Sequence, residues 1–223
     1  PGRSIAQDSD VQPLFYSDVL YIADQAAAAL TSAQSEEITL GNITPANIIV
    51  DDVRHIRLVD CCLPRPSPGK TVDSYELSDM RYRAPEQLEG GEVTPASDIF
   101  ALGLVFYELL TGVYPIEADT VESYRERLTT EPLDFNSIAS QRIPTDAHLL
   151  LESMCAIDPA ERISSLSLLA SLQEMHDQHE AQIVHVGDEL DDGPHHNPRR
   201  LLVLSLIAAL LVVFWFVITV IER

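Results

Sequence analysis

The segment from Ser97 to Gly112 constrains this chain more than any other, because its apolar residues are not confined to one face of a helix. A helix that is apolar on all sides is buried on all sides. The segment is too short to span a bilayer and contains Glu108, which argues against a membrane helix. We therefore predict a central core helix, with Ser97 or Asp98 capping its start and Gly112 closing its end.

The residues before this helix predict one more helix and a short hairpin. Apolar residues recur at helical spacing from Val19 to Leu30, and Ser17 is the expected N-cap. Two β-rich runs, 48–50 and 55–59, flank a polar turn and predict a β-hairpin that Asp60 closes.

Three helices are expected after the central one, at 120–128, at 146–157 with Thr145 as its cap, and from Ser164 or Ser165 onward. The last is expected to carry Leu166, Leu169 and Leu172 on one face. The resulting fold class is mainly α (α+β), with a single short β-hairpin.

The charge balance limits the classes of partner. Lys and Arg number 14 against 35 Asp and Glu, which gives a formal net charge of −21. A nucleic-acid partner needs a basic face, so this composition argues against one. Three cysteines, two of them adjacent, do not form a disulfide framework and favour a reducing compartment.

The run from Leu201 to Ile221 contains no charged residue. At a rise of ~1.5 Å per residue it reaches about 30 Å, the thickness of a hydrocarbon core. We therefore predict a single transmembrane helix, the alternative being a buried helix of a soluble domain. Arg199 and Arg200 precede the run, so the N-terminal side is expected to face the cytoplasm.

These features divide the chain into three parts: a folded domain at 1–175, an acidic linker rich in His, Asp and Pro at 176–198, and a membrane anchor at 199–223. The histidines of the linker raise a metal site as an alternative. Their spacing matches no zinc pattern and no cysteine accompanies them, which favours a solvated tether.

Several ordered motifs in residues 1–175 resemble the C-terminal lobe of protein kinases. Ala84-Pro85-Glu86 lies upstream of the central helix at the spacing of the Ala-Pro-Glu motif, and Arg162 belongs to an Asp-Pro-x-x-Arg motif. Asp98, with Gly103, matches the buried helix that anchors this lobe. The resemblance implies a helical, Ser/Thr-kinase-like lobe in which Arg162 pairs with Glu86. A partly buried pair would cost about 3–5 kcal/mol to break, against about 0–1 kcal/mol for an ordinary surface pair.

The resemblance also assigns positions to the chemistry. Asn47 and Asp60 match the two residues that hold Mg²⁺ on the phosphates of ATP, and they are the candidate metal-binding and cofactor-binding residues. Kinases of this family carry a Gly-rich loop and a phosphate-holding lysine on a β-rich N-terminal lobe, which we expect upstream of Pro1 or on another chain.

No intact catalytic residue is found at the remaining positions. The base position is occupied by Asn42, whose amide does not accept a proton at neutral pH, and the lysine position by Thr44. Gly41 stands where the family has an arginine, and Asp79 where a threonine contacts the base. Cys62 replaces the glycine of the metal-binding motif.

This combination predicts a membrane-tethered pseudokinase that acts as a signalling scaffold or regulator for cytoplasmic protein partners, with weak or absent binding of ATP and Mg²⁺. The alternative is an active Ser/Thr protein kinase that transfers the γ-phosphate of ATP to protein hydroxyls by means of a relocated base.

Overall fold

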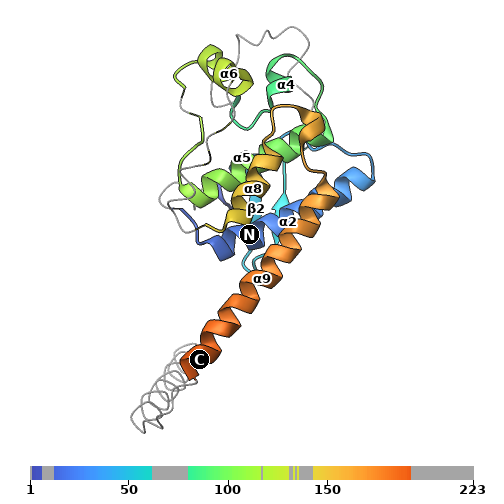
Figure 1. Cartoon of the computed structure of the whole chain (residues 1–223). Helices are drawn as coiled ribbons and strands as arrows, with labels where there is room; N and C mark the ends of the chain where they lie inside the picture. Colours follow the sequence, from blue (N-terminus) through green and yellow to red (C-terminus); the bar gives the residue numbers. More distant parts are fainter. Residues whose placement is uncertain are drawn as a thin grey trace, which may run out of the picture. The chain divides into compact units, whose positions relative to one another are not determined.

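The computed structural model describes residues 2–6, 13–61, 80–116, 118–130, 133, 135 and 143–191, with side chains up to residue 181. Residues up to Glu180 form one compact unit. Its strands are β1 (Arg3–Ser4), β2 (Ile48–Val50) and β3 (Ile56–Leu58). Its helical elements, in chain order and as labelled in Figure 1, are α2 (Tyr16–Ser35), η1 (Pro45–Asn47), α4 (Pro85–Leu88), α5 (Pro95–Thr111), α6 (Val121–Thr130), α8 (Thr145–Met154), η3 (Pro159–Glu161) and α9 (Ser165–Asp191).

The strands form one antiparallel sheet in the order β1-β2-β3. Ile48 pairs with Leu58 and Val50 with Ile56, so the predicted hairpin is confirmed. The side chain of Asp51 holds the turn, because its Oδ1 accepts the N–H groups of Val53 at 3.0 Å and of His55 at 2.8 Å. The third strand, β1, was not predicted, since two residues show no period.

Helix α5 lies at the centre, as its sequence indicates, with nearly every side chain buried. Its start lies earlier than expected. Thr94, not Ser97 or Asp98, is the N-cap: its backbone N–H donates to Ser97 Oγ at 2.8 Å, and its hydroxyl accepts from the Ser97 N–H at 3.3 Å. Pro95 then occupies the first helical position, which needs no N–H donor. The predicted C-cap is confirmed, since Gly112 has φ of 72°.

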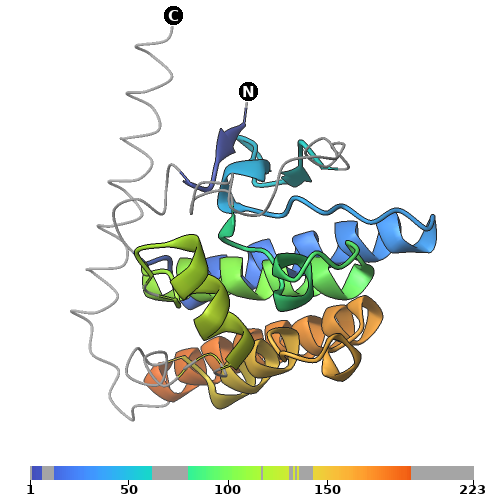
Figure 2. The same ribbon diagram turned by 90° about the horizontal axis from the view of Figure 1, so that it is seen from above.

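The elements are layered (Figure 2). The sheet lies on one side of α2 and α5, and α8 lies with α9 on the other side. Ala26 and Ala27 of α2 are fully buried, and small side chains at these positions bring α2 close to its neighbours. Helix α2 begins at Tyr16 with Phe15 as the N-cap residue, so Ser17 is inside the helix rather than its cap.

The later helices correct three expectations. Thr145 is the first residue of helix α8, and Pro144 rather than Thr145 is its N-cap. Helix α8 ends at Met154, three residues before the predicted end. Helix α9 buries Leu168, Leu172 and Met175, whereas Leu166 is 69% exposed. The sequence spacing of 166, 169 and 172 is also helical, so periodicity alone did not decide which of two overlapping apolar rows faces the core.

Helix α9 also continues to Asp191, into the segment expected to be an irregular linker. The side chains that support it there pair along the helix. Gln178 Nε2 donates to Glu174 Oε1 at 3.4 Å, and His176 Nε2 lies 3.4 Å from Glu180 Oε1. His179 also packs edge-on against the ring of Tyr16, with the ring centroids 5.4 Å apart, so the start of this segment is held both by pairs along the helix and by a contact with α2.

Within the described residues no helix is both long enough and apolar enough to cross a bilayer. The run from Leu201 to Ile221 lies outside them, so the membrane anchor stays a prediction.

Candidate functional site

The loop that enters β2 brings three of the predicted site residues together. Asn47 Nδ2 donates a hydrogen bond to the carbonyl oxygen of Asn42 at 3.0 Å. Asn42 Nδ2 in turn donates to the carbonyl oxygen of Asp60 at 3.0 Å. The N–H of Val59 also donates to the Asn47 carbonyl at 2.9 Å, so the loop and the end of β3 are joined at two points. Residues 18 positions apart therefore form one site.

The chemistry of Asn47 and Asp60 fits a hard divalent cation. The NH₂ group of Asn47 is engaged by a backbone carbonyl, which turns the amide oxygen toward the other side. Asp60 is exposed and has φ of 52°, a left-handed conformation that is strained for a residue with a Cβ atom. Amide and carboxylate oxygens are ligands that Mg²⁺ accepts. Among the described residues no group of three or more His, Cys, Asp or Glu gathers as a metal site.

Asn42 and Thr44 provide neither a general base nor a positive charge for a phosphoryl group. The amide of Asn42 uses an N–H donor on the Asp60 carbonyl. Its remaining oxygen is a neutral acceptor with no basicity at physiological pH. Thr44 precedes η1 in an extended conformation and carries no charge. Cys62 and Asp79 lie outside the described residues.

Asp98 orients this loop from the first turn of α5. Its Oδ2 accepts the N–H of Leu40 and its Oδ1 accepts the N–H of Gly41, both at 2.7 Å. The carboxyl group is 2% exposed, and burial raises its pKa to about 6, an effect that the two backbone N–H groups oppose. Gly41 has φ of 73°, and a Cβ atom there would lie 3.1 Å from Cγ1 of Val93. Glycine adopts this conformation without the strain that a side chain would add.

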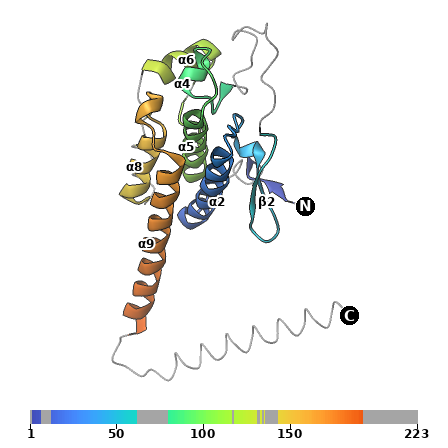
Figure 3. The same ribbon diagram turned by 90° about the vertical axis from the view of Figure 1, so that its right-hand side faces the viewer.

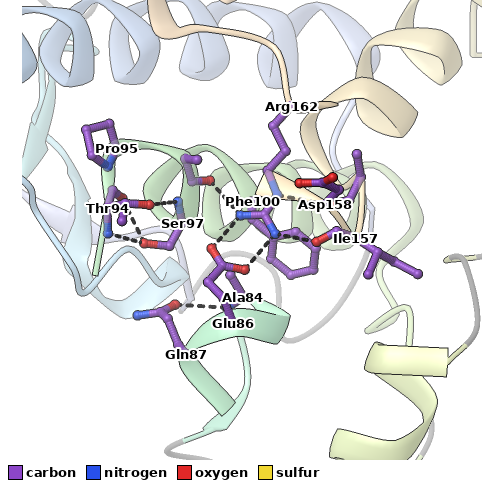
Figure 4. Close-up of polar contacts among 12 residues, drawn as sticks. Ala84, Glu86, Gln87, Thr94, Pro95, Ser97, Phe100, Ile157, Asp158 and Arg162 are labelled. Atoms are coloured by element: carbon purple, nitrogen blue, oxygen red, sulfur yellow. Dashed lines mark hydrogen bonds and ion pairs between the residues drawn. The ribbon is translucent and has the colours of Figure 1, made fainter. Parts of the chain in front are cut away.

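A buried ion pair fixes α4 against the segment between α8 and α9 (Figure 4). Arg162 Nη1 and Nη2 donate to Glu86 Oε1 and Oε2, each at 2.7 Å. The guanidinium also donates to three backbone carbonyls and lies 4.8 Å from the ring centroid of Phe100. These carbonyls belong to Ala96, Ala156 and Ile157.

The predicted pair of Arg162 with Glu86 is therefore present. The side chain of Arg162 is 0% exposed and that of Glu86 is 20% exposed, which excludes an ordinary surface pair. All five N–H donors of the arginine have protein acceptors, the condition under which a guanidinium is tolerated in a core.

Sequence patterns did not predict a cluster of three tyrosines that contacts α5. Tyr82 has φ of 69°, and its N–H donates to the hydroxyl of Tyr114 at 3.3 Å. The hydroxyls of Tyr114 and Tyr124 lie 2.6 Å apart, and the Tyr82 hydroxyl donates to the carboxylate of Glu108. Burial raises the pKa of Tyr114 to about 12, which keeps its hydroxyl protonated. The signal available in the sequence was Glu108, a charge within an otherwise apolar helix.

The chain is similar in sequence to bacterial serine/threonine-protein kinases. The chain is 34% identical over 161 residues to the serine/threonine-protein kinase PknD of Mycobacterium tuberculosis, covering 71% of this chain and 24% of PknD. It is 34% identical over 113 residues to the serine/threonine-protein kinase PrkC of Bacillus subtilis, covering 50% of this chain and 17% of PrkC. The chain thus spans about a quarter or less of the length of these relatives.

Among solved structures, the fold is similar to the crystal structure of Rad53 1-466 in complex with AMP-PNP. The TM-score is 0.62 at 19% sequence identity, over 75% of this chain and 43% of the Rad53 chain. This likeness concerns the fold alone. The sequence profile of the protein kinase domain matches residues 11–174, the greater part of the chain. From this match, together with the arrangement of Asn47, Asp60, Glu86, Asp98 and Arg162, we conclude that the chain belongs to the protein kinase domain family.

Proposed function

We propose that this chain is part of a pseudokinase related to the bacterial Ser/Thr protein kinases, and that it acts as a signalling scaffold or regulator. The observation that carries the proposal is Asn42. It occupies the base position with an amide, and that amide is used to bind the carbonyl of Asp60. A general base must accept a proton from the substrate hydroxyl, and an amide does not do so at neutral pH.

Two neighbouring positions support the same conclusion. Thr44 stands where the family has a lysine that steadies the transferred phosphoryl group, and Gly41 where it has an arginine. The contacts that shape the loop are retained, since Asp98 binds the backbone of Leu40 and Gly41 rather than their side chains. A loop with its support and without its reactive groups is suited to binding rather than phosphoryl transfer.

Residual binding of ATP with Mg²⁺ is part of the proposal. Asn47 and Asp60 would hold the cation through their side-chain oxygens. When bound, the cation neutralises charge on the phosphates. Asn42 would keep Asp60 in place by its hydrogen bond to the Asp60 carbonyl. The nucleotide also needs a β-rich lobe, which we expect upstream of Pro1 or on another chain.

We further propose that the run from Leu201 to Ile221 anchors the protein in a membrane as a single-pass helix. Its lack of charge and its length support this placement. Arg199 and Arg200 favour a cytoplasmic position for the kinase domain, where its protein partners would be found.

An active Ser/Thr protein kinase is the second candidate. It is favoured by the relatives, which are named as serine/threonine-protein kinases. Because position 42 carries an amide, this candidate requires that a carboxylate from another position receives the proton of the substrate hydroxyl.

The two candidates are separated by titrating ATP, with and without Mg²⁺, into this chain joined to whatever lobe is encoded upstream. Under the proposal, binding is weak, strengthens with Mg²⁺ and disappears in Asp60→Ala, and no phosphate is transferred to protein. Phosphate transfer that depends on Asp60 would establish the active kinase instead. Asn42→Asp is the matched variant: a gain of transfer there would identify the missing base as the cause of inactivity.

A further inference from the structure

An open groove lies between α8 and the first half of α9. Figure 3 shows these two helices on the side of α2 and α5 away from the sheet. Its volume is about 410 Å³. Leu150 and Met175 form its apolar floor, each less than 10% exposed, and Leu149 is 56% exposed at its lip. A groove of this size accommodates one or two large apolar side chains of a peptide.

Two carboxylates lie on opposite walls of the groove. Asp146 lies on α8 and Glu174 on α9, and both are exposed. Among the described residues, Glu174 accepts a hydrogen bond from the amide of Gln178 at 3.4 Å, and this neutral group does not offset the negative charge of Glu174. Burial raises the pKa of Tyr16 on α2, and the negative charge of Asp146 adds to this increase.

The wider surface of α8 and α9 also carries negative charge. Between residues 143 and 181 no lysine occurs, and the single arginine, Arg162, is buried against Glu86. The carboxylates of this stretch are all exposed: Asp146, Glu152, Asp158, Glu161, Glu174, Asp177 and Glu180. Clustered charge of one sign attracts ligands of the opposite sign and selects against like-charged ones.

We propose that the α8–α9 groove is a docking site for a basic amphipathic peptide segment of a partner protein. Large apolar side chains of that segment would enter between Leu149 and Met175. Lysine or arginine side chains on either side of them would pair with Asp146 and Glu174. The combination of an apolar floor and an anionic rim favours this occupant over an acidic or purely apolar one. The groove is separate from the nucleotide site, so the proposal does not rest on the proposed function.

The test uses the full chain in a non-ionic detergent and a fluorescent peptide of about 15 residues, roughly four helical turns. The peptide carries leucines on one helical face and lysines on the other. A second peptide has the same composition in scrambled order. Binding is measured by fluorescence anisotropy. We expect the patterned peptide to bind more tightly than the scrambled one, and more weakly as salt increases.

Glu174→Lys is expected to weaken binding about tenfold, and Leu149→Ser several-fold. The matched control is Glu122→Lys, the same charge change at an exposed position of α6, which is expected to change binding less than twofold. In the unsubstituted chain, hydrogen exchange is expected to slow on peptide binding at residues 146–153 and 171–178 and to stay unchanged in α6.

Four results would overturn the proposal. Equal losses from Glu174→Lys and Glu122→Lys, or equal binding of both peptides, would indicate attraction to net charge alone. Tighter peptide binding by Arg199→Glu/Arg200→Glu would assign the groove to the chain's own basic segment. Dissociation of a dimer on peptide binding, followed by sedimentation, would assign it to a second copy of the chain.

Discussion

The ion-pair site at Arg162 and the loop at Asn42 belong to the same compact unit. They differ in how far their polar side chains are buried and in how many hydrogen bonds these side chains make. Arg162 is fully buried and places five N–H donors on protein acceptors. Asn42 is half-buried, and within the described part of the chain its side chain makes one hydrogen bond, to the carbonyl of Asp60. Every N–H donor of Arg162 has an acceptor, while the amide of Asn42 is a neutral group that does not accept a proton at physiological pH.

The difference follows from what each contact demands of the sequence. A buried guanidinium must keep its partners, because a stranded charge is costly in a core. Asp98 holds the loop by two hydrogen bonds, which we call the clamp. The clamp makes no such demand on the side chain at position 42, because it uses the backbone N–H groups of Leu40 and Gly41. The identity of residue 42 therefore changes without loss of the loop's position.

The largest expected effect comes from breaking the first of these regions. Arg162→Ala leaves the Glu86 carboxylate without its partner, and we expect a loss of about 3–5 kcal/mol in the free energy of unfolding. Urea denaturation of the full chain measures it. Arg57→Ala is the control, because Arg57 makes an exposed pair with Asp51 and its removal should have no measurable effect. Equal effects of the two substitutions would contradict the distinction between buried and surface pairs.

Asp98→Asn tests the clamp that joins the two regions. An amide offers one acceptor oxygen, so one of the two backbone N–H groups loses its partner, at a cost of about 1–3 kcal/mol. Faster hydrogen exchange of the Leu40 and Gly41 amides reports the loss of the clamp. If their exchange stays unchanged, the clamp does not hold the loop.

The same variant carries a pH test. Burial raises the pKa of Asp98 from 3.8 to about 6, so the folded state binds a proton that the unfolded state has lost. The stability due to this proton is present below about pH 4 and is lost as pH rises through about 6. Other titrating groups cancel in the difference, so the stability advantage of the unsubstituted protein over Asp98→Asn should narrow between pH 4 and 6. A gap that widens with pH would contradict the raised pKa.

Gly103→Ala tests how tightly α5 packs against the end of α8. A Cβ atom there would lie 2.6 Å from Cys155 Sγ and 3.0 Å from Met154 Cβ. Overpacking of this kind costs about 1–3 kcal/mol, partly offset by about 1 kcal/mol of helix propensity. Thermal unfolding should show a net loss, and adding Cys155→Ala should restore part of it. No recovery in the double variant would locate the strain elsewhere.

The smallest effect is expected at Asn42. Asn42→Ala removes one half-buried hydrogen bond, and we expect a loss of about 1 kcal/mol or less. The loss should be local, appearing as faster hydrogen exchange at the residues following Asp60, with the global transition nearly unchanged. A loss as large as that of Arg162→Ala would place Asn42 in the folding framework and remove the contrast between the two regions.

Much of the fold could be predicted from local sequence. The apolar run of α5 required burial on all sides, and the paired β-rich runs gave the hairpin of β2 and β3. The errors concerned one helix boundary and one helix face. Thr94 rather than Ser97 caps α5, and Leu168 rather than Leu166 faces the core on α9. Both depend on which neighbour a residue meets, and periodicity does not contain that information.

The sequence by itself determined the family resemblance, the central helix and the pairing of Glu86 with Arg162, and it supplies the amide at position 42 on which the proposed function rests. Only the tertiary structure decided what Asp98 binds, how Tyr82 meets Glu108, and that α8 and α9 enclose an acidic groove. The partners of Asp98 are 57 and 58 positions away in the chain. Side chains that distant meet through the packing of whole helices, and local patterns of hydrophobicity and charge do not specify that packing.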